Sequence, residues 1–463
     1  MPELAFLWTD VLIWLLVLLV SGFGLAASRH EHLREPWRRV MRSRTGVASA
    51  LVLSVFVVTG LLDSVHFRPV RDGGDTPTGE VLSLFDVLVT PLRTRQEKTY
   101  SSPLATHLFA KETFDLPDGT QTRGFPRLVY GGAHLADPEA DRATDLLVTT
   151  LQGTVAATLT WLVIAVAIAW ATGRGEGGIL NGARRLWRQA GGFPWRTFFL
   201  VSGIVLLVIW VTALLGTRYH LLGTDKVGED VFYQALKSIR TGLVIGTLTT
   251  LVMLPAAIFL GIAAGYFRGG VDDIIQYLYT TLNSIPGVLL IAAAVLMLQV
   301  YMDNNADQFS TLVERADMRL LFLCMILGIT SWTGLCRLLR GETLKLRELD
   351  YVEAAHGFGV GHFTILGRHI VPNVLHIVLI SVVLDFSGRV LAEAVLSYVN
   401  IGVDPTTHSW GNMINSARLE LAREPIVWWS LAAAMIFMFT LVLAANLFSD
   451  VVRDAFDPRL RQQ

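Results

Sequence analysis

Nine long apolar stretches constrain this chain more than any other feature of its sequence. They cover residues 5–27, 47–66, 147–171, 198–216, 240–265, 272–299, 319–336, 374–396 and 426–447. A helix needs about 20 mostly apolar residues to cross the hydrocarbon core of a bilayer. Hydrophobic residues make up 52% of the chain and charged residues 17%, so a soluble fold of this size could not bury the apolar surface. The sequence therefore predicts an all-α polytopic membrane protein.

Basic residues gather in three of the connections between these stretches, at 28–46, 172–197 and 337–371. Connections on the cytoplasmic side of a membrane carry an excess of Lys and Arg. Nine alternating spans place all three connections on one side together with the C-terminal tail, so we expect this side to face the cytoplasm. The first stretch lacks the basic start of a signal peptide, because no Lys or Arg precedes Arg29 in the chain. We therefore expect this stretch to remain as a span.

Several kinds of function are disfavoured by what the sequence lacks. None of the five lysines follows a glycine, so there is no phosphate-binding Gly-Lys-Ser/Thr loop and no nucleotide site is expected in this chain. A net charge of -1 gives no general attraction for nucleic acid. No HExxH or GxSxG motif is present, so we do not expect an enzyme. His362, His369 and His376 recur every seven residues, but Pro372 interrupts the helix that would align them, and no metal site is expected.

The connection at 67–146 is the longest in the chain, and the alternation of spans puts it outside the cell. It contains short apolar runs such as residues 81–85. A small external subdomain and a partly disordered loop both fit this composition, and both interpretations remain open.

The segment 350–373, DYVEAAHGFGVGHFTILGRHIVPN, is the most informative connection on the basic side. Asp350 followed by Glu353 predicts a capped helix start. The glycines at 357, 359 and 361 predict the end of that helix, since glycine tolerates the left-handed conformation. A second amphipathic segment is expected from Phe363 to Ile370, with Pro372 beginning the next span. The spacing alone fits a projecting helical hinge, but an ordinary amphipathic connector fits it equally well.

These residues resemble a known family. EAA at 353–355, with glycine at 359 and HIVPN at 369–373, is similar to the EAA loop of bacterial ABC importer permeases, and in particular to the dipeptide/oligopeptide/nickel permease family. Further similar segments follow in the family's order, at 220–231 (HLLGTDKVGEDV), 265–273 (GYFRGGVDD) and 396–414 (LSYVNIGVDPTTHSWGNMI). The resemblance covers about residues 198–463 and implies a type I ABC importer core of six spans.

The resemblance implies how the loop works and what it works with. The loop would dock on one or two cytoplasmic ABC ATPases, which would hold ATP and Mg, so no cofactor is expected in this chain. The ATPase-coupling residues carried over are Glu353, Ala354, Ala355, Gly357, Gly359, His369 and Pro372. A second, homologous permease subunit and an extracytoplasmic solute-binding protein are the other expected partners. The implied location is the bacterial inner membrane, and the implied substrates are di- or oligopeptides, with nickel or another small solute as the alternative.

The chain also departs from the family pattern. Glu229 stands where an arginine is usual, and Asn400 where a glycine is usual. Residues 1–197 lie outside the ordinary core: we expect two extra spans with a basic loop at 1–66, the external insert at 67–146, and a third extra span with a basic linker at 147–197. The resemblance assigns no role to this part of the chain.

Three charged residues fall within the apolar stretch 374–396. Asp385, Arg389 and Glu393 are spaced four residues apart and share one face of a helix. Charges at this depth usually face the interior of a bundle or an aqueous path. They could line the translocation path and receive the charged ends of a peptide, or form a self-neutralising ladder that fixes helix packing. They also give some support to a different class of protein, an ion-coupled secondary transporter or channel that needs no ATPase.

Overall fold

Nine helices in the described part of the chain can cross a membrane, as the sequence predicts. The computed structural model describes residues 3–29, 31–69, 81–115, 121–173, 178–188, 192–305 and 311–456. Within these residues, nine helices are long and apolar enough to cross a membrane. They are α1 (Trp8–Arg29), α3 (Arg44–Asp63), α6 (Pro138–Gly173), α8 (Trp195–Gly216), α9 (Val231–Phe267), α11 (Gly287–Asn304), α12 (Leu312–Arg347), α15 (Val371–Tyr398) and α17 (Trp429–Phe456). The all-α, multi-pass fold class is therefore confirmed. Arg174, Arg459 and Arg461, which contribute to the predicted basic side, lie outside the described residues.

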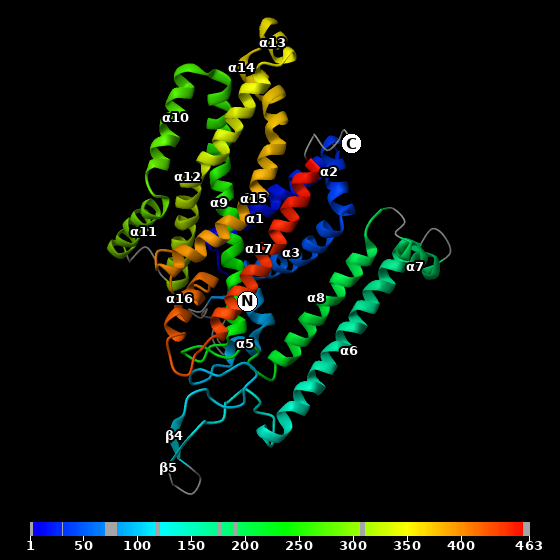
Figure 1. Cartoon of the computed structure of the whole chain (residues 1–463), viewed down its shortest axis with the longest axis vertical. Coiled ribbons are helices and arrows are strands. Elements are labelled where there is room, and N and C mark those ends of the chain that lie inside the picture. Colours follow the sequence, from blue (N-terminus) through cyan, green and yellow to red (C-terminus); the bar gives the residue numbers. More distant parts are fainter. Residues whose placement is uncertain are drawn as a thin grey trace.

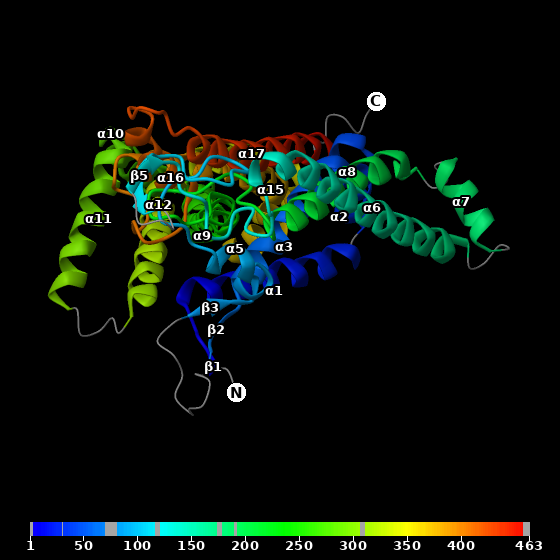
Figure 2. The same ribbon diagram turned by 90° about the horizontal axis from the view of Figure 1, so that it is seen from below.

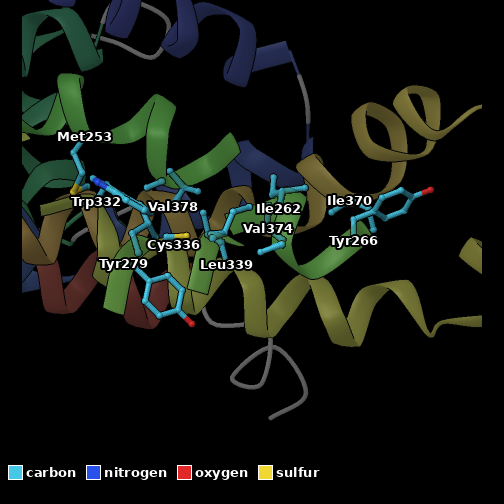
Figure 3. Packing of buried hydrophobic residues seen from close by; sticks show 14 of the residues in the cluster. Met253, Ile262, Tyr266, Tyr279, Trp332, Cys336, Leu339, Ile370, Val374 and Val378 are labelled. Carbon is cyan, nitrogen blue, oxygen red and sulfur yellow. The ribbon is translucent and has the colours of Figure 1, made fainter. Parts of the chain in front are cut away.

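Helices α9 and α12 form the centre of the molecule and pack against each other along much of their length (Figure 1). Two glycines one turn apart on α9 allow this contact. A Cβ on Gly261 would lie 2.8 Å from the carbonyl oxygen of Cys336, and one on Gly265 would lie 2.7 Å from that of Arg340. Small residues at this spacing let two membrane helices approach closely. The buried cluster that results runs from Met253 and Trp332 at one end to Tyr266 at the other (Figure 3).

The predicted span 272–299 is wrong as a single helix. The structure divides it into α10 (Gly269–Ser284) and α11, and α11 turns away from the bundle in Figure 1. Pro286 causes the break, since it offers no backbone N–H and forces the preceding residue out of helical geometry. Ile285 is accordingly extended, with φ -88° and ψ 128°.

The N-terminal helices lie against one side of this centre (Figure 2). Helices α6 and α8 form a hairpin, joined by the short α7 (Ile179–Trp187), and α8 also contacts α3. Helix α8 is the first span of the predicted core. Its main neighbours nevertheless belong to residues 1–197, the N-terminal addition that lies outside this core. Helix α2 (Glu31–Arg42) carries part of the basic segment and packs on α17, with the rings of Trp37 and Phe456 5.6 Å apart.

The described part of the insert is built from short elements that lie at the opposite end of the molecule from the segment 350–373 (Figure 1). Its elements are β3 (Leu82–Ser83), the helices α4 (Leu84–Leu88) and α5 (Thr90–Thr94), and a hairpin of β4 (Glu112–Asp115) and β5 (Gln121–Gly124). Strand β3 completes a three-stranded antiparallel sheet with β1 (Glu3–Leu4), at the start of the chain, and β2 (His66–Arg68), where the insert begins. Helix α16 (Trp410–Glu420) lies at the same end. The described residues therefore favour the subdomain interpretation.

A buried histidine joins the insert to the predicted core. His220 Nδ1 lies 2.7 Å from Asp230, the residue that caps α9, and His220 Nε2 lies 3.4 Å from Glu97 of the insert. Glu97 also accepts hydrogen bonds from the backbone N–H groups of Val129, Tyr130 and Gly131. Burial alone would lower the pKa of His220, but the two carboxylates outweigh it and raise the pKa to about 9. The insert is thus fixed to the bundle by a charged contact.

Replacing His220 with glutamine is expected to loosen this attachment. Because the folded-state pKa of His220 is raised from 6.5 to about 9, its stabilising effect is fully present below pH 6.5 and is lost as the pH rises through about 9. Backbone hydrogen exchange in residues 97–131 of the purified protein, corrected for intrinsic rates, should therefore lose protection across this range. His220→Gln should lack protection throughout, whereas His107→Gln, which removes a half-buried histidine of the insert, should behave as the wild type. Identical pH profiles in all three proteins would contradict this role.

Candidate functional site

The segment 350–373 projects beyond the other elements at one end of the molecule (Figure 1). It contains α13 (Asp350–Gly357), the short α14 (His362–Ile365) and a π-helical turn, η2 (Leu366–Ile370). Helices α9 and α12 end beside it, at Phe267 and Arg347. The segment therefore sits where movement of its tip would act directly on three long helices.

The start of α13 differs from the prediction. Leu349, with an extended backbone, is the capping residue, and it makes no side-chain capping bond. Asp350 is instead the first helical residue, so the predicted capping box is wrong. Asp350 and Glu353 still lie in the first turn, where negative charge is favourable beside the unpaired N–H groups of a helix N-terminus.

The hinge after α13 depends on one glycine. The N–H of Phe358 donates to the carbonyl of Ala354 at 2.9 Å, and the N–H of Val360 donates to that of Ala355 at 3.1 Å. This closing pattern requires a left-handed residue between them, and Gly359 has φ +73°. Gly357 remains helical, and Gly361 is extended at the start of α14. The prediction that all three glycines break the helix is therefore right only for Gly359.

The second helical segment is not separate from the following span. α14, η2 and α15 run on without interruption, so the span begins at His362 rather than at residue 374. Pro372 lies in the first turn of α15, directly after the π-helical turn. A proline inside a helix removes one backbone hydrogen bond and crowds the preceding turn. The wider π-helical turn leaves room for it, and the helix continues into α15.

Two contacts hold the base of the loop in place. Tyr266, at the end of α9, hydrogen-bonds through its hydroxyl to His362 Nδ1 at 3.0 Å. The ring of His369 lies 5.7 Å from the ring of Tyr351 in α13. Apolar side chains buried below the loop add to these contacts: Val352, Ile365 and Ile370. The sequence-predicted residue His369 thus connects α13 to the start of α15.

The remaining predicted residues of the loop are mostly exposed. Glu353, Ala354 and Gly359 are exposed, and Ala355 is half-buried. Two aromatic residues that the sequence analysis missed stand beside them: Phe358 is 87% exposed and Phe363 is 85% exposed. A phenylalanine before a glycine hinge is a recognisable signal, because a hinge tip has no core to bury it. Large apolar side chains this exposed at a projecting tip indicate a protein contact surface.

A hollow of about 780 Å³ lies between this loop and the ends of α9 and α12. Glu353 and Gly357 line it from α13, and Arg268, Arg347 and Glu348 line it from the opposite side. An ion pair joins Arg268 to Glu348 across the ends of the two helices. The loop is therefore attached at its base and open beneath its first helix, which leaves α13 room to move.

The three charged residues of α15 are divided between two environments. Arg389 Nη2 lies 3.3 Å from Asp385. Glu393 is buried and accepts a hydrogen bond from the hydroxyl of Ser397 at 2.7 Å. The ladder interpretation predicts that Arg389 is shared between both carboxylates, but the structure pairs it with Asp385.

A second cluster of charges, at the end of the molecule near the insert, was not predicted from the sequence. It lines a cavity of about 370 Å³ between the insert, α9 and α12. Lys237 Nζ lies 2.6 Å from Asp63 and 3.0 Å from Asp86, and Arg240 lies 2.6 Å from Asp10. These three aspartates come from the N-terminal addition and the insert, whereas both cations belong to α9; Asp317 of α12 lies 3.7 Å from Arg240 as a further partner. The addition therefore contributes walls and charges to a cavity of the central bundle.

Known proteins share the region that contains the loop. The family described as "Binding-protein-dependent transport system inner membrane component" matches residues 257–462. The chain is 33% identical over 244 residues to the glutathione transport system permease protein of Pectobacterium atrosepticum, which covers 52% of this chain and 73% of that protein. It is 31% identical to an oligopeptide transport system permease protein of Mycobacterium tuberculosis, over 53% of this chain and 78% of the relative. The dipeptide transport system permease protein of Bacillus subtilis is 28% identical, over 52% and 70% respectively.

Proposed function

Because the chain belongs to the family of binding-protein-dependent inner membrane components, the permeases of ABC importers for peptides and nickel, we propose that it is the membrane-spanning subunit of an ATP-driven peptide importer. The substrate class is supported by the relatives, whose names specify glutathione, dipeptides and oligopeptides. Nickel or another small solute is the alternative. The bacterial inner membrane is the location that the family description supports.

The observation that carries the mechanism is the projecting loop with its two exposed phenylalanines and a single left-handed glycine. A cytoplasmic ATPase that binds this tip would displace α13 when it changes conformation. The continuous α14–η2–α15 segment would transmit this displacement into the membrane. ATP binding and hydrolysis, with Mg, take place in one or two partner subunits. The permease then shifts between two packings by rigid-body movement.

Two further partners complete the proposed assembly. A homologous second permease supplies the other half of the path, and the splayed α11 offers it an apolar surface that includes the exposed residues Leu289, Leu296 and Met297. A solute-binding protein delivers the substrate at the end of the molecule that carries the insert. This end lies opposite the ATPase loop (Figure 1).

Co-purification with an ATPase and ATP-driven uptake test this proposal against an ion-coupled transporter. The chain should be recovered with a second permease and an ATPase. Vesicles that contain the complete assembly should accumulate a labelled tripeptide only when ATP and the solute-binding protein are present. Uptake driven by a proton gradient in vesicles containing this chain alone would instead establish the ion-coupled class.

A further inference from the structure

Arg389 is a buried cation with incomplete hydrogen bonding. Its side chain is about 9% exposed, and its Nε and Nη1 atoms have no hydrogen-bond partner among the residues that the structure describes. Only Nη2 is engaged, by Asp385 at 3.3 Å and by the sulfur of Met253 at 2.9 Å. Buried polar groups are nearly always hydrogen-bonded, because leaving a donor unpaired away from water is costly. The cost is greater for a charged donor inside a membrane span.

The position of Arg389 points to the interior of the transporter rather than to an aqueous end. It lies nine residues before Tyr398, the last residue of α15, which places it roughly 14 Å from that end of the helix. Met253, whose sulfur accepts the hydrogen bond from Arg389, belongs to the buried cluster and lies beside Trp332 (Figure 3). Arg389 thus lies well inside the span rather than at its end.

Next to Arg389 runs a face of α15 that the residues described by the structure leave uncovered. Leu384, Gly388, Leu391 and Val395 are exposed at helical spacing. Asp385 is exposed on the same face, with 48% of its side chain accessible. Its ion pair is long for a charge-assisted hydrogen bond. A carboxylate that approaches along this face would thus meet Asp385 first, and the buried Arg389 guanidinium lies directly behind it, one helical turn further on.

We infer that Arg389 binds the free carboxylate of a solute in the translocation path, and that the solute displaces Asp385 from it. The inference rests on the proposed function, because it needs a solute that passes along this face. Guanidinium groups suit carboxylates through charge-assisted hydrogen bonds. Asp385 neutralises Arg389 while the path is empty and leaves two donor nitrogens for the solute. Glu393 is not among the partners of Arg389 in the described part of the chain; its carboxylate instead accepts a hydrogen bond from the Ser397 hydroxyl, one turn further on.

A carboxylate has two sources at this position, the solute and an acidic side chain of the second permease. The test uses the complete transporter in vesicles, with trialanine and trialanine amide as labelled probes. For each variant, uptake gives the ratio of kcat/KM for the acid to kcat/KM for the amide. The same solute-binding protein delivers both peptides to every variant, so its own preference cancels when these ratios are compared.

Arg389→Gln is expected to lower the acid-to-amide ratio about tenfold, which is the effect of losing one charge-assisted hydrogen bond. Arg389→Lys should retain part of the preference, because it keeps the charge. Asp385→Asn should raise the ratio, because it removes the internal competitor. Arg453→Gln is the matched control: Arg453 is exposed near the end of α17, paired with Asp450 at 3.2 Å, and its loss should leave the ratio unchanged.

Three results would overturn the inference. One is an unchanged acid-to-amide ratio in Arg389→Gln. Another is loss of the second permease from purified Arg389→Gln, with equal effects on both peptides, which would assign the carboxylate to the partner subunit. If Arg389→Gln does not assemble, unchanged ratios in both Arg389→Lys and Asp385→Asn are equally decisive. Failure of the wild type to carry either peptide would refute peptide transport itself, whereas uptake with an unaltered ratio refutes only the role of Arg389.

Discussion

Replacing Gly359 with tryptophan is expected to abolish ATP-driven uptake while the chain stays in the membrane at its normal level. Gly359 has φ +73°, a conformation that costs an ordinary residue about 1–2 kcal/mol. A Cβ at this position would meet no atom within 4 Å, so the added side chain begins in open space. The substitution instead changes the angle of the hinge and the surface that binds the ATPase. Uptake and co-purification of the ATPase both measure it.

Smaller substitutions separate the two effects. Gly359→Asn should retain much of the activity, because asparagine tolerates the left-handed conformation better than other residues. Gly359→Ala tests the backbone alone, since it adds one methyl group in open space. Gly341→Ala is the matched control: Gly341 is helical in α12 and a Cβ there also meets nothing within 4 Å, so activity should persist. Normal uptake by Gly359→Trp would argue against the role of the loop.

The sequence contained enough information for the spans and for the hinge, because both depend on local patterns. Apolar length located the nine candidate membrane helices among the described residues, and the conformational freedom of glycine placed the hinge within three glycines, of which only Gly359 is left-handed. Local breaks were harder to locate. The residues on both sides of Pro286 are apolar, so hydropathy alone does not indicate the division between α10 and α11. Pro372 suggested a helix start, but a π-helical turn lets the helix pass through it.

The charge cluster near the insert could not be predicted from the sequence for a different reason. Its ion pairs join residues far apart in the chain, such as Lys237 with Asp63 and Arg240 with Asp10. Nothing in the local sequence around an aspartate specifies which distant cation it meets. The same limit applies to Arg389, whose spacing fits Asp385 and Glu393 equally well. Only the fold shows that Glu393 is engaged by Ser397 instead.

Lys237→Met is expected to destabilise the protein more than any other single substitution at the junction of the insert and the bundle. The Lys237 ammonium group is the shared partner of Asp63 and Asp86, whose side chains are 4% and 6% exposed. Burial alone would raise the pKa of Asp86, but Lys237 and hydrogen bonds from Ser83 and Tyr233 lower it. Methionine would leave two buried carboxylates without their cation. Breaking one side of a buried ion pair costs about 3–5 kcal/mol.

The melting temperature of the purified protein in detergent should therefore fall by several degrees in Lys237→Met. Lys226→Met removes an exposed lysine from the loop before α9 and should change nothing. The triple variant Lys237→Met, Asp63→Asn, Asp86→Asn removes the unpaired charges together with the cation, and it should recover most of the loss, since replacing a whole buried ion pair is often nearly neutral. If Lys237→Met has the same melting temperature as the Lys226→Met control, the insert is held by its backbone and apolar contacts. If the triple variant recovers nothing, the shape of the lysine side chain matters more than its charge.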